Sequence, residues 1–339
     1  MTDINSCVET LGTPDFPIIV LRDEQGREAR IAPGAGFNAF SFTVPHAEER
    51  TPIIIEPPSD DVLRGGGFSF GCPILFPFPN RTRGGRYVFA GHEYQLDVNY
   101  KDGNAIHGLV ANRAWQVVDS GASNGQGSWV SGRFDTQQYP EVLRQYPFPC
   151  VLTVTWTLRD GRLHLHAQAQ NTGDAALPMG FGIHPWFSAP LTPRGRRAEC
   201  VLTVPARGRW QLESEQQLIP TGDILPLENG FDFSRGAKLG QQFLDDVYTR
   251  LVYEGDGHVC TVDDSASGLR LEVRASHVFR EHVVYAPLDR DVICLEPYTG
   301  TTDFVNLSAR GVDAGMITLQ PGEQWQGDIS IALRVMETG

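Results

Sequence analysis

A long hairpin pattern in the middle of the chain constrains the fold more than any other feature. The segments 151–158 and 162–170 both alternate apolar and polar residues, and Asp160-Gly161 lies in the connection between them. A period of two is typical of a strand with one buried face, and Asp-Gly between two such strands is a strong hairpin signal. Strand patterns recur at 86–96, around a turn at Ala90-Gly91, and at 269–273 and 329–335. We therefore expect a structure in which antiparallel strands predominate.

Helical periodicity is scarce by comparison. Two short segments, 140–145 and 240–244, have some helical character. The 36 glycines and 23 prolines are spread along all 339 residues, so no linker, repeat or low-complexity tail divides the chain. β-Sandwiches often exceed roughly two hundred residues as one unit. These features predict an all-β fold: a single large antiparallel β-sandwich domain over residues 1–339, with few short helices and long functional loops.

Composition limits the partners and the compartment. The formal net charge of −13 disfavours nucleic acid and anionic membranes, because Lys and Arg dominate phosphate binding. A neutral small molecule suits this charge, although a local arginine cluster is enough to bind a phosphorylated one. The chain begins without a basic, apolar leader and contains no run of eighteen apolar residues. We expect a cytoplasmic protein, monomeric or homodimeric, with its six scattered cysteines reduced.

One histidine stands in a setting that suits proton transfer. In the stretch 180–187, His184 lies among aromatic and apolar residues and directly precedes Pro185. Histidine is the side chain whose ordinary pKa lies nearest neutrality, and proline stiffens the backbone beside it. The same pattern also suits a hydrogen-bonded histidine of the core.

A glutamate at the end of an apolar segment is the second candidate. Glu296 follows the apolar run 292–295 and precedes Pro297. Burying a bare carboxylate is costly, so this side chain is expected to be paired or to face a cleft. Partial burial raises the pKa of a carboxyl group and makes it a better proton acceptor near neutrality.

Three further segments carry candidate polar residues. Prolines interrupt the apolar segment 71–81, which predicts a rigid, partly buried connection ending at Asn80 and Arg81. Asn80 and Arg81 then either serve a site or, for Arg81, pair with a surface acid. His107 precedes a glycine that permits close approach of a ligand to the backbone. Of the neighbouring acids Asp245 and Asp246, only one can face a site, and the other is expected to meet solvent.

His164 and His166 lie on one face of a predicted strand, which raises the question of a metal site. Zinc sites need three or four protein ligands, and no further ligands stand nearby in the sequence. A polar outer face of the sheet explains this pair, and we predict no metal.

These segments together resemble the aldose 1-epimerase (galactose mutarotase) family, in order along most of the chain. The resemblance rests on Asn80-Arg81, on Asn104 to Gly108, on His184-Pro185-Trp186-Phe187, on 219–226 followed by 231–233, on Asp245 and on Leu295-Glu296-Pro297. The chain departs from galactose-specific members at 77–79, at 109–115 and at Pro185-Trp186. These departures leave His184 and Glu296 in place, and they concern which sugar fits.

The resemblance implies a galactose mutarotase-like supersandwich fold and an enzyme that interconverts the anomers of a hexose. It implies Glu296 as the general base at the anomeric hydroxyl, His184 as the general acid at the ring oxygen and His107 as an assistant. It also implies substrate contacts from Asn80, Arg81, Asp245 and Trp186, with Phe187 as a further candidate for stacking on the sugar. Neither a metal nor another cofactor is required.

Three alternatives remain open from the sequence. A hexose 6-phosphate 1-epimerase needs a basic rim, and Arg81, Arg83, Arg86 and Arg113 are the candidates for it. A non-catalytic sugar-binding module needs aromatic residues but not the His184 and Glu296 pair. A glycosidase needs two carboxyl groups, and Asp245 with Glu296 is the formal candidate.

Overall fold

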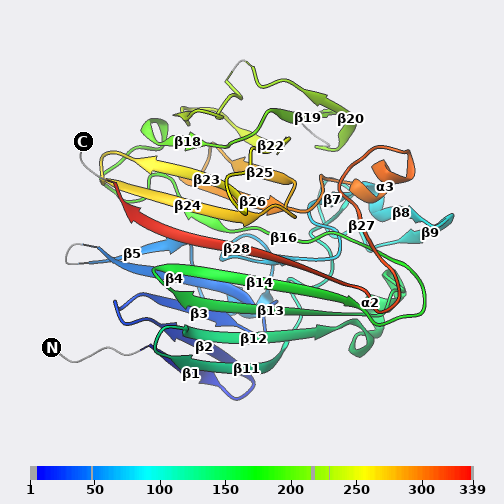
Figure 1. Ribbon diagram of the computed structural model, residues 1–339, viewed down its shortest axis with the longest axis horizontal. Coiled ribbons are helices and arrows are strands. Elements are labelled where there is room, and N and C mark those ends of the chain that lie inside the picture. Colours follow the sequence, from blue (N-terminus) through cyan, green and yellow to red (C-terminus); the bar gives the residue numbers. More distant parts are fainter. Residues whose placement is uncertain (1–5, 47–48, 215–217, 229, 337–339) are drawn as a thin grey trace.

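Two large antiparallel sheets dominate the computed structural model, which describes residues 6–46, 49–214, 218–228 and 230–336 (Figure 1). The thirteen strands of the first sheet, in spatial order, are β1 (Cys7–Thr13), β2 (Phe16–Arg22), β3 (Glu28–Ala32), β4 (Asn38–His46), β5 (Glu49–Ile54), β17 (Trp186–Ser188), β26 (Val292–Tyr298), β25 (Glu281–Ala286), β22 (Leu244–Thr249), β19 (Gly208–Leu212) and β20 (Pro220–Leu225), with β16 (Gly182–Ile183) paired to β26 and β6 (Ile74–Leu75) paired to β16.

The nine strands of the second sheet, in spatial order, are β11 (Gln116–Ser123), β12 (Gly127–Asp135), β13 (Cys150–Arg159), β14 (Arg162–Asn171), β28 (Gln324–Val335), β24 (Leu269–Ser276), β23 (Gly257–Asp264), β18 (Val201–Thr203) and β21 (Ala237–Lys238). The last long strand, β28, joins the two halves of this sheet because it pairs with β14 on one side and β24 on the other (Figure 1).

Short elements complete the described chain. The small strand pairs are β7 (Arg81–Thr82) with β10 (Ala105–Ile106), β8 (Arg86–Phe89) with β9 (His92–Gln95), and β15 (Leu177–Met179) with β27 (Ile317–Leu319). The α-helices are α1 (Asp60–Gly65), α2 (Pro140–Gln145) and α3 (Phe304–Ala309), and single 3₁₀ turns cover Arg83–Gly85, Thr136–Gln138 and Arg197–Glu199. No helix in these described segments is long and apolar enough to span a membrane.

The predicted central hairpin is confirmed as β13 and β14. The register pairs Arg159 with Arg162 across the turn, and Asp160 and Gly161 have φ angles of 53° and 73°. Two consecutive residues with positive φ are what a two-residue hairpin turn of type I′ requires. The predicted hairpin at 86–96 is also confirmed, with Ala90 and Gly91 in its turn at φ angles of 51° and 79°.

Of the two segments predicted to be helical, one forms a helix and the other does not. Residues 140–145 form α2, with its proline at the start of the helix, where the missing N–H is tolerated. The segment 240–244 is not helical, because Gly240 has a φ of 63° and Leu244 already pairs with Ala286 as the first residue of β22. The helices α1 and α3 were missed, since six residues are too few to establish a helical period.

The core lies between the two sheets, as the alternation predicts. Along β13, Leu152, Val154, Trp156 and Leu158 are fully buried, while the residues between them are partly exposed. The indole N–H of Trp156 donates to the carbonyl oxygen of Phe37 at 3.1 Å, which connects the second sheet to the β3–β4 turn of the first. Burying each such apolar side chain contributes about 1.5–3 kcal/mol.

The proline-rich segment 71–81 is buried throughout, whereas the sequence predicts only partial burial. Proline cannot donate to a strand ladder, so pairing along the segment is confined to short stretches: β6 with β16, Phe76 with Gly108, and Arg81 with Ile106. The segment runs beside residues 180–186: the backbone N–H groups of Gly180, His184 and Trp186 donate to carbonyl oxygens of Pro77, Pro73 and Gly71. It therefore delivers Asn80 and Arg81 from inside the protein.

Candidate active site

One pocket of about 410 Å³ contains all seven residues predicted for the site from the sequence. Its lining includes Asn80, Arg81, His107, His184, Trp186, Asp245 and Glu296. These residues come from segments that are up to 216 positions apart, between Asn80 and Glu296. The structure thus brings the candidate residues together, whereas their individual roles stay predictions.

Strand register places His184 opposite Glu296. Gly182 of β16 pairs with Tyr298 of β26, and Trp186 of β17 pairs with Cys294 of the same strand. His184 lies midway between the two pairs and Glu296 midway between their partners. Residues two apart along a strand face the same side, so both side chains are presented to the same face of the sheet.

The imidazole of His184 and the carboxyl group of Glu296 lie close together in the pocket. Nδ1 of His184 lies 3.4 Å from Oε1 of Glu296, but the geometry does not make a hydrogen bond, and this nitrogen has no other partner. The hydroxyl of Tyr298 donates to Oε2 of Glu296. The carboxyl group is therefore held on one side and unpartnered at the oxygen that faces the histidine.

Burial shifts the pKa values of these two groups in opposite directions. Removal from water lowers the pKa of His184 to about 3, and it raises the pKa of Glu296 well above its usual range. Desolvation disfavours whichever form is charged, so both shifts have the same cause. Burial therefore favours the arrangement in which the carboxyl group holds the proton and the imidazole is neutral.

Aromatic contacts orient the histidine. The ring of His184 stacks on Trp186, with centroids 5.1 Å apart and an interplanar angle of 10°. His107 meets His184 edge-on at 5.1 Å, and burial lowers the pKa of His107 well below its ordinary value. Nδ1 of His107 is buried without a hydrogen-bond partner. Two neutral imidazoles with unused nitrogens thus line one pocket.

Two of the site residues hold strained backbone conformations. Asn80 and His107 have φ angles of 61° and 63°, a region that residues other than glycine rarely adopt. The backbone N–H of His107 donates to the carbonyl oxygen of Asn80 at 2.8 Å, which joins the two segments. Such strain is concentrated at functional sites, where the surrounding structure maintains it.

Arg81 is fixed by acids of the pocket rather than by a surface acid. Its Nε donates to Oδ2 of Asp102 at 2.7 Å, and its Nη1 lies 3.9 Å from Oδ2 of Asp245. The amide oxygen of Asn80 accepts from the Arg81 guanidinium at 3.1 Å. Asn80 therefore has a clear local task, the positioning of Arg81, besides lining the pocket.

Asp245 is the acid of its pair that faces the pocket. Burial raises its pKa to about 6, and Asp246 points to the other side of β22. The expectation that the second acid meets solvent was wrong: Asp246 is buried and pairs with Arg209 at 3.1 Å. Both faces of this strand are covered, so the outward-facing residue also needed a partner.

The predicted stacking residues divide between the pocket and the core. Phe187 is fully buried and is not part of the pocket, since it points away from Trp186 on the same strand. Trp186 lines the pocket but is only 4% exposed, with its indole N–H donating to Phe68 and the guanidinium of Arg290 4.6 Å from its ring. Phe243 and Tyr285, which were not predicted, offer more open aromatic surface there.

The predicted arginine rim is dispersed. Of its four members, Arg81 alone lines the pocket; Arg83 pairs with Glu213 and Arg113 with Glu141. The basic residues that do line the pocket besides Arg81 are Lys101 and Arg290. Both stand in loops outside any recognisable motif, which is why sequence patterns did not indicate them.

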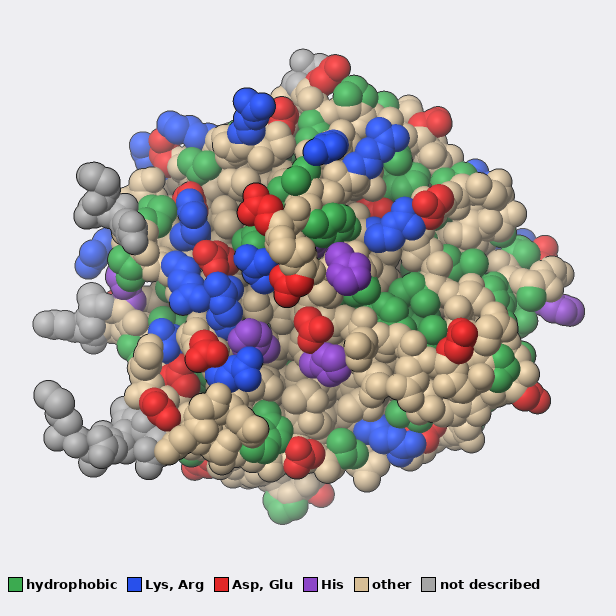
Figure 2. Space-filling model, in the orientation of Figure 1, with side chains coloured by type: hydrophobic (Ala, Val, Ile, Leu, Met, Phe, Trp, Pro, Cys, Tyr) green, Lys and Arg blue, Asp and Glu red, His purple; other side chains and the backbone are tan. Residues whose placement is uncertain are grey.

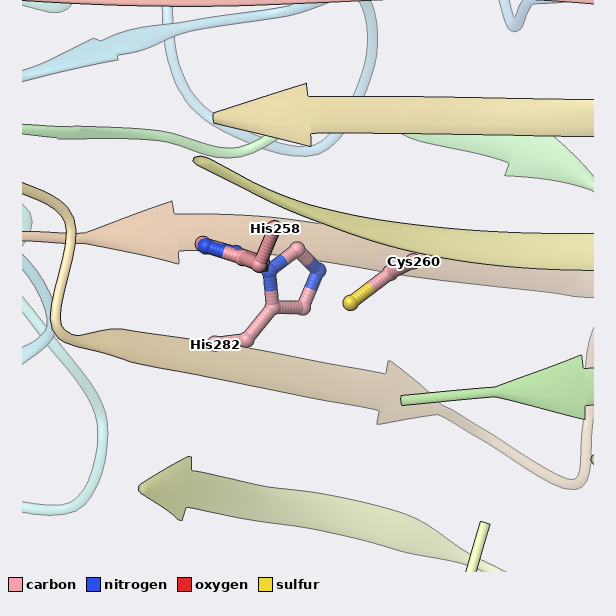
Figure 3. Close-up of side chains that lie close together, drawn as sticks. All are labelled: His258, Cys260 and His282. Carbon is pink, nitrogen blue, oxygen red and sulfur yellow. Dashed lines mark hydrogen bonds between the residues drawn. The ribbon is translucent and has the colours of Figure 1, made fainter. Parts of the chain in front are cut away.

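The HxH pair lies on the outer face of β14. His166 is exposed and pairs with Asp328 of the neighbouring strand β28 at 2.7 Å, whereas His164 is half-buried and its Nε2 has no hydrogen-bond partner in the described structure. Figure 2 shows acidic and basic side chains interspersed over the face of the molecule that it draws. Two other groups, among the residues that the structure describes, bring three possible metal ligands together. One is His184, Cys294 and Glu296, of which His184 and Glu296 line the pocket, and the other is His258, Cys260 and His282 (Figure 3).

Comparison with known proteins gives the family. The family model for aldose 1-epimerase matches residues 17–332. The chain is 36% identical over 166 residues to the uncharacterized Escherichia coli protein YihR and 29% identical over 172 residues to mouse galactose mutarotase. These matches span 47% and 49% of this chain and 46% of each relative, about half of their length.

A solved structure supports the same assignment at the level of the fold. A galactose mutarotase-like protein from Clostridium acetobutylicum superposes with a TM-score of 0.86 at 20% identity, over 97% of this chain and 98% of its own. The predicted galactose mutarotase-like fold is thereby confirmed. The family model covers most of this chain, and the chain therefore belongs to the aldose 1-epimerase family.

Proposed function

We propose that this protein is an aldose 1-epimerase that interconverts the α and β anomers of a hexose by acid/base ring opening. The observation that carries the proposal is the contact between His184 and Glu296 inside the pocket. Family membership and the similarity to a relative named galactose mutarotase support it.

In the proposed mechanism, the carboxylate of Glu296 removes the proton of the anomeric hydroxyl while protonated His184 gives a proton to the ring oxygen. The bond between C1 and the ring oxygen then breaks and leaves an open-chain aldehyde. Rotation about the C1–C2 bond and closure with the proton transfers reversed give the other anomer. Each positioned acid or base contributes roughly 10²–10⁴-fold.

The proton inventory of the site suits this cycle. The acid and base roles need one shared proton, on His184 before ring opening and on Glu296 after it. Burial favours the arrangement with Glu296 protonated and His184 neutral, which is the state that follows ring opening. Ring opening therefore starts once the shared proton has moved from Glu296 to His184, and the dry pocket then favours its passage from the histidine to the ring oxygen.

The remaining pocket residues are proposed to bind the sugar hydroxyl groups. Arg81 and Asp245 present a guanidinium and a carboxyl group at the same wall, 3.9 Å apart. A pair of this kind can donate to one hydroxyl group and accept from its neighbour. Phe243 and Tyr285 supply apolar surface for a ring face, and His107 adds a neutral imidazole beside His184.

A second candidate, a hexose 6-phosphate 1-epimerase, has one observation in its favour. Lys101 and Arg290 line the pocket, and neither has a carboxylate within ion-pair distance among the described residues. Cations that have no carboxylate partner at a pocket suit an anionic substituent. The predicted cluster of four arginines is not what supplies them, so this candidate rests on different residues from those first considered.

The experiment that tests the proposal follows anomer relaxation by polarimetry or NMR. Freshly dissolved single anomers of several aldoses, and of their 6-phosphates, are mixed with the protein and compared with the spontaneous reaction. We expect accelerated relaxation of at least one free aldose. Faster turnover of the 6-phosphates favours the second candidate, and no acceleration across the panel contradicts both and leaves a sugar-binding module.

A further inference from the structure

A thiol that the proposed mechanism does not use lies beside the two proton-transfer groups. Cys294 is fully buried and stands two residues before Glu296 on β26, so the two side chains face the same side of the sheet. Across the sheet, Cys294 pairs with Trp186 of β17 and with Tyr285 of β25, and both of these rings line the pocket. The sulfur therefore lies next to the part of the pocket that His184 and Glu296 form.

The ligand atoms of the three residues are close enough to share one ion. Sγ of Cys294, one nitrogen of His184 and one carboxylate oxygen of Glu296 all lie within 4.8 Å of one another. Two ligands that each lie about 2.0–2.2 Å from a tetrahedral ion are roughly 3.3–3.6 Å apart. Nδ1 of His184 and Oε1 of Glu296 already have this spacing, at 3.4 Å. Because sulfur binds zinc at about 2.3 Å, Sγ has to move by at most roughly 1.2 Å, which a rotation about the Cα–Cβ bond supplies.

The nitrogen and the oxygen that face each other have no hydrogen bond among the described residues. Nδ1 of His184 is buried without a partner, and the residue as a whole is only 6% exposed. Oε1 of Glu296 is near this nitrogen alone, whereas Oε2 accepts from Tyr298. A buried polar atom without a partner calls for an explanation. One ion between Nδ1 and Oε1 gives both of these atoms a bond at the same time.

Neighbouring side chains hold these two groups in place. The ring of His184 stacks on Trp186, with centroids 5.1 Å apart, and the hydroxyl of Tyr298 donates to the far oxygen of the Glu296 carboxyl group. In metal sites, contacts of this kind orient the ligands and are nearly as important as the ligands themselves. The imidazole and the carboxyl group are thus positioned before an ion arrives, and only the sulfur has to adjust.

We propose that His184, Cys294 and Glu296 form an inhibitory site for one zinc(II) ion. Imidazole, thiolate and carboxylate are all ligands of zinc, and zinc sites with three protein ligands keep a fourth position for water. Zinc(II) with one thiolate, one carboxylate and one neutral imidazole has no net charge, which suits a buried site. Copper(I) on the same ligands leaves a negative charge, and magnesium and calcium take oxygen ligands rather than a thiolate.

Binding in this form involves no oxidation or reduction. The S–H bond of Cys294 breaks, its proton leaves to solvent, and a bond from sulfur to zinc forms. The proton that His184 and Glu296 share also leaves, so the carboxylate binds through an oxygen and the neutral imidazole through the lone pair of a nitrogen. Proton release accompanies metal binding because only the deprotonated groups are ligands. The ion enters through the pocket that His184 and Glu296 line.

The bound ion blocks the proposed reaction, a consequence that rests on the proposed function. With zinc on its carboxylate, Glu296 no longer accepts the proton of the anomeric hydroxyl. The proton that His184 needs for the ring oxygen has left the site. The catalysed relaxation therefore stops, and only the spontaneous reaction continues.

The experiment titrates zinc(II) into the full-length, metal-free and reduced protein, with the free zinc fixed by a chelating buffer. The zinc retained on the protein is counted, and the relaxation of the best aldose is followed in the same samples. We expect relaxation to fall to the spontaneous rate as the ion binds and to recover when EDTA removes it. Cobalt(II) in place of zinc is expected to give a thiolate-to-cobalt charge-transfer band, a signal that needs no catalytic activity.

Cysteine variants assign the ion to the site, each compared with its own metal-free rate. Cys294→Ala is expected to hold one equivalent fewer than the parent and to lack the charge-transfer band. It is also expected to need at least about 100-fold more zinc for inhibition, since loss of a residue that merely supports a ligand costs up to about that factor. Cys294→Val, which also removes the thiol, is a second variant in case Cys294→Ala does not fold.

Cys72→Ala is the matched control, because Cys72 is also fully buried and its thiol pKa is raised by burial and by the nearby charge of Glu296. It is expected to behave as the parent does. No zinc on the parent, or equal retention and inhibition in the parent and Cys294→Ala, overturns the proposal. Zinc held through Cys294 without loss of relaxation overturns its inhibitory part. A parent that accelerates no aldose but shows the Cys294-dependent cobalt band contradicts the proposed function and supports the metal site.

Discussion

Nδ1 of His184 lies 3.4 Å from Oε1 of Glu296, and burial shifts the pKa values of the two groups apart. The pair therefore titrates as a unit and holds one proton over a wide range of pH. At the lower end of this range, the pair gains a second proton, on His184, only near the lowered pKa of that residue, about 3. At the upper end, the shared proton is lost as pH rises through the raised pKa of Glu296.

The first prediction concerns the pH dependence of the catalysed relaxation. We expect kcat/KM to change near pH 6, where Asp245 titrates, then to stay constant through neutrality and to fall at alkaline pH, when no proton remains for the ring oxygen. An ordinary histidine, with a pKa of about 6.5, gives a fall centred near that value instead. Rates corrected for spontaneous relaxation across pH 4–10 distinguish the two. A fall in kcat/KM with its midpoint near pH 6.5 contradicts the assignment.

Tyr298 is predicted to position Glu296 and to tune it. Its hydroxyl donates to Oε2 of Glu296 and lowers the pKa of that carboxyl group against the effect of burial. In Tyr298→Phe we expect a lower kcat, a nearly unchanged KM and an alkaline limb of kcat/KM displaced to higher pH. A variant with reduced kcat but the same pH profile as the parent shows that the hydroxyl acts only through packing.

Asp102 is predicted to act on substrate binding through Arg81, whose Nε it holds at 2.7 Å. Asp102→Asn weakens this charged hydrogen bond, and we expect KM to rise on the order of tenfold while kcat changes little. Glu213→Gln removes the partner of Arg83 in an exposed pair and serves as the control, because such pairs contribute little. Equal KM values for the two variants argue against a positioning role for Asp102.

Glu281 is predicted to make the stability of the protein depend on pH. Burial raises its pKa to about 8, while the same group has a pKa of 4.5 when exposed. The folded form then holds a proton that the unfolded form releases, so this contribution is fully present below pH 4.5 and is lost as pH rises through 8. The shift corresponds to at most about 4–5 kcal/mol.

The Glu281→Gln variant isolates this effect, since its amide oxygen can still accept from the indole N–H of Trp210. We expect the variant to be more stable than the parent above pH 8 and the difference to diminish towards pH 5. Denaturant unfolding at pH 5, 7 and 9 measures it. The same difference at all three pH values shows that the carboxyl group does not titrate with folding.

The overall architecture could be predicted from short-range patterns, and the candidate site from motifs that resemble those of the family. Period-two alternation and the Asp160-Gly161 turn define the central hairpin, and His184 and Glu296 stand beside apolar strand segments whose pairing sets them face to face. The polar residues of the motifs occur in the family's order along the chain, and the structure gathers them in one pocket.

Other features depended on tertiary contacts that no local pattern reveals. Lys101, Arg290 and Phe243 reach the pocket from loops, and the burial of Asp246 follows from Arg209 on a neighbouring strand. The segment 240–244 failed as a helix because its last residue joins the first sheet. His282 is distant in sequence from Cys260, so their cluster becomes visible only when the two sheets pack.

The most direct test of the central claim is the rate of anomer relaxation in Glu296→Gln, compared with Glu281→Gln. Both changes remove one buried carboxyl group from adjacent strands, and only Glu296 lines the pocket. On the best substrate of the aldose panel, we predict that Glu296→Gln slows the catalysed rate by roughly 10²–10⁴-fold and that Glu281→Gln leaves it unchanged. A Glu296→Gln protein that relaxes the anomer as fast as the parent contradicts the account.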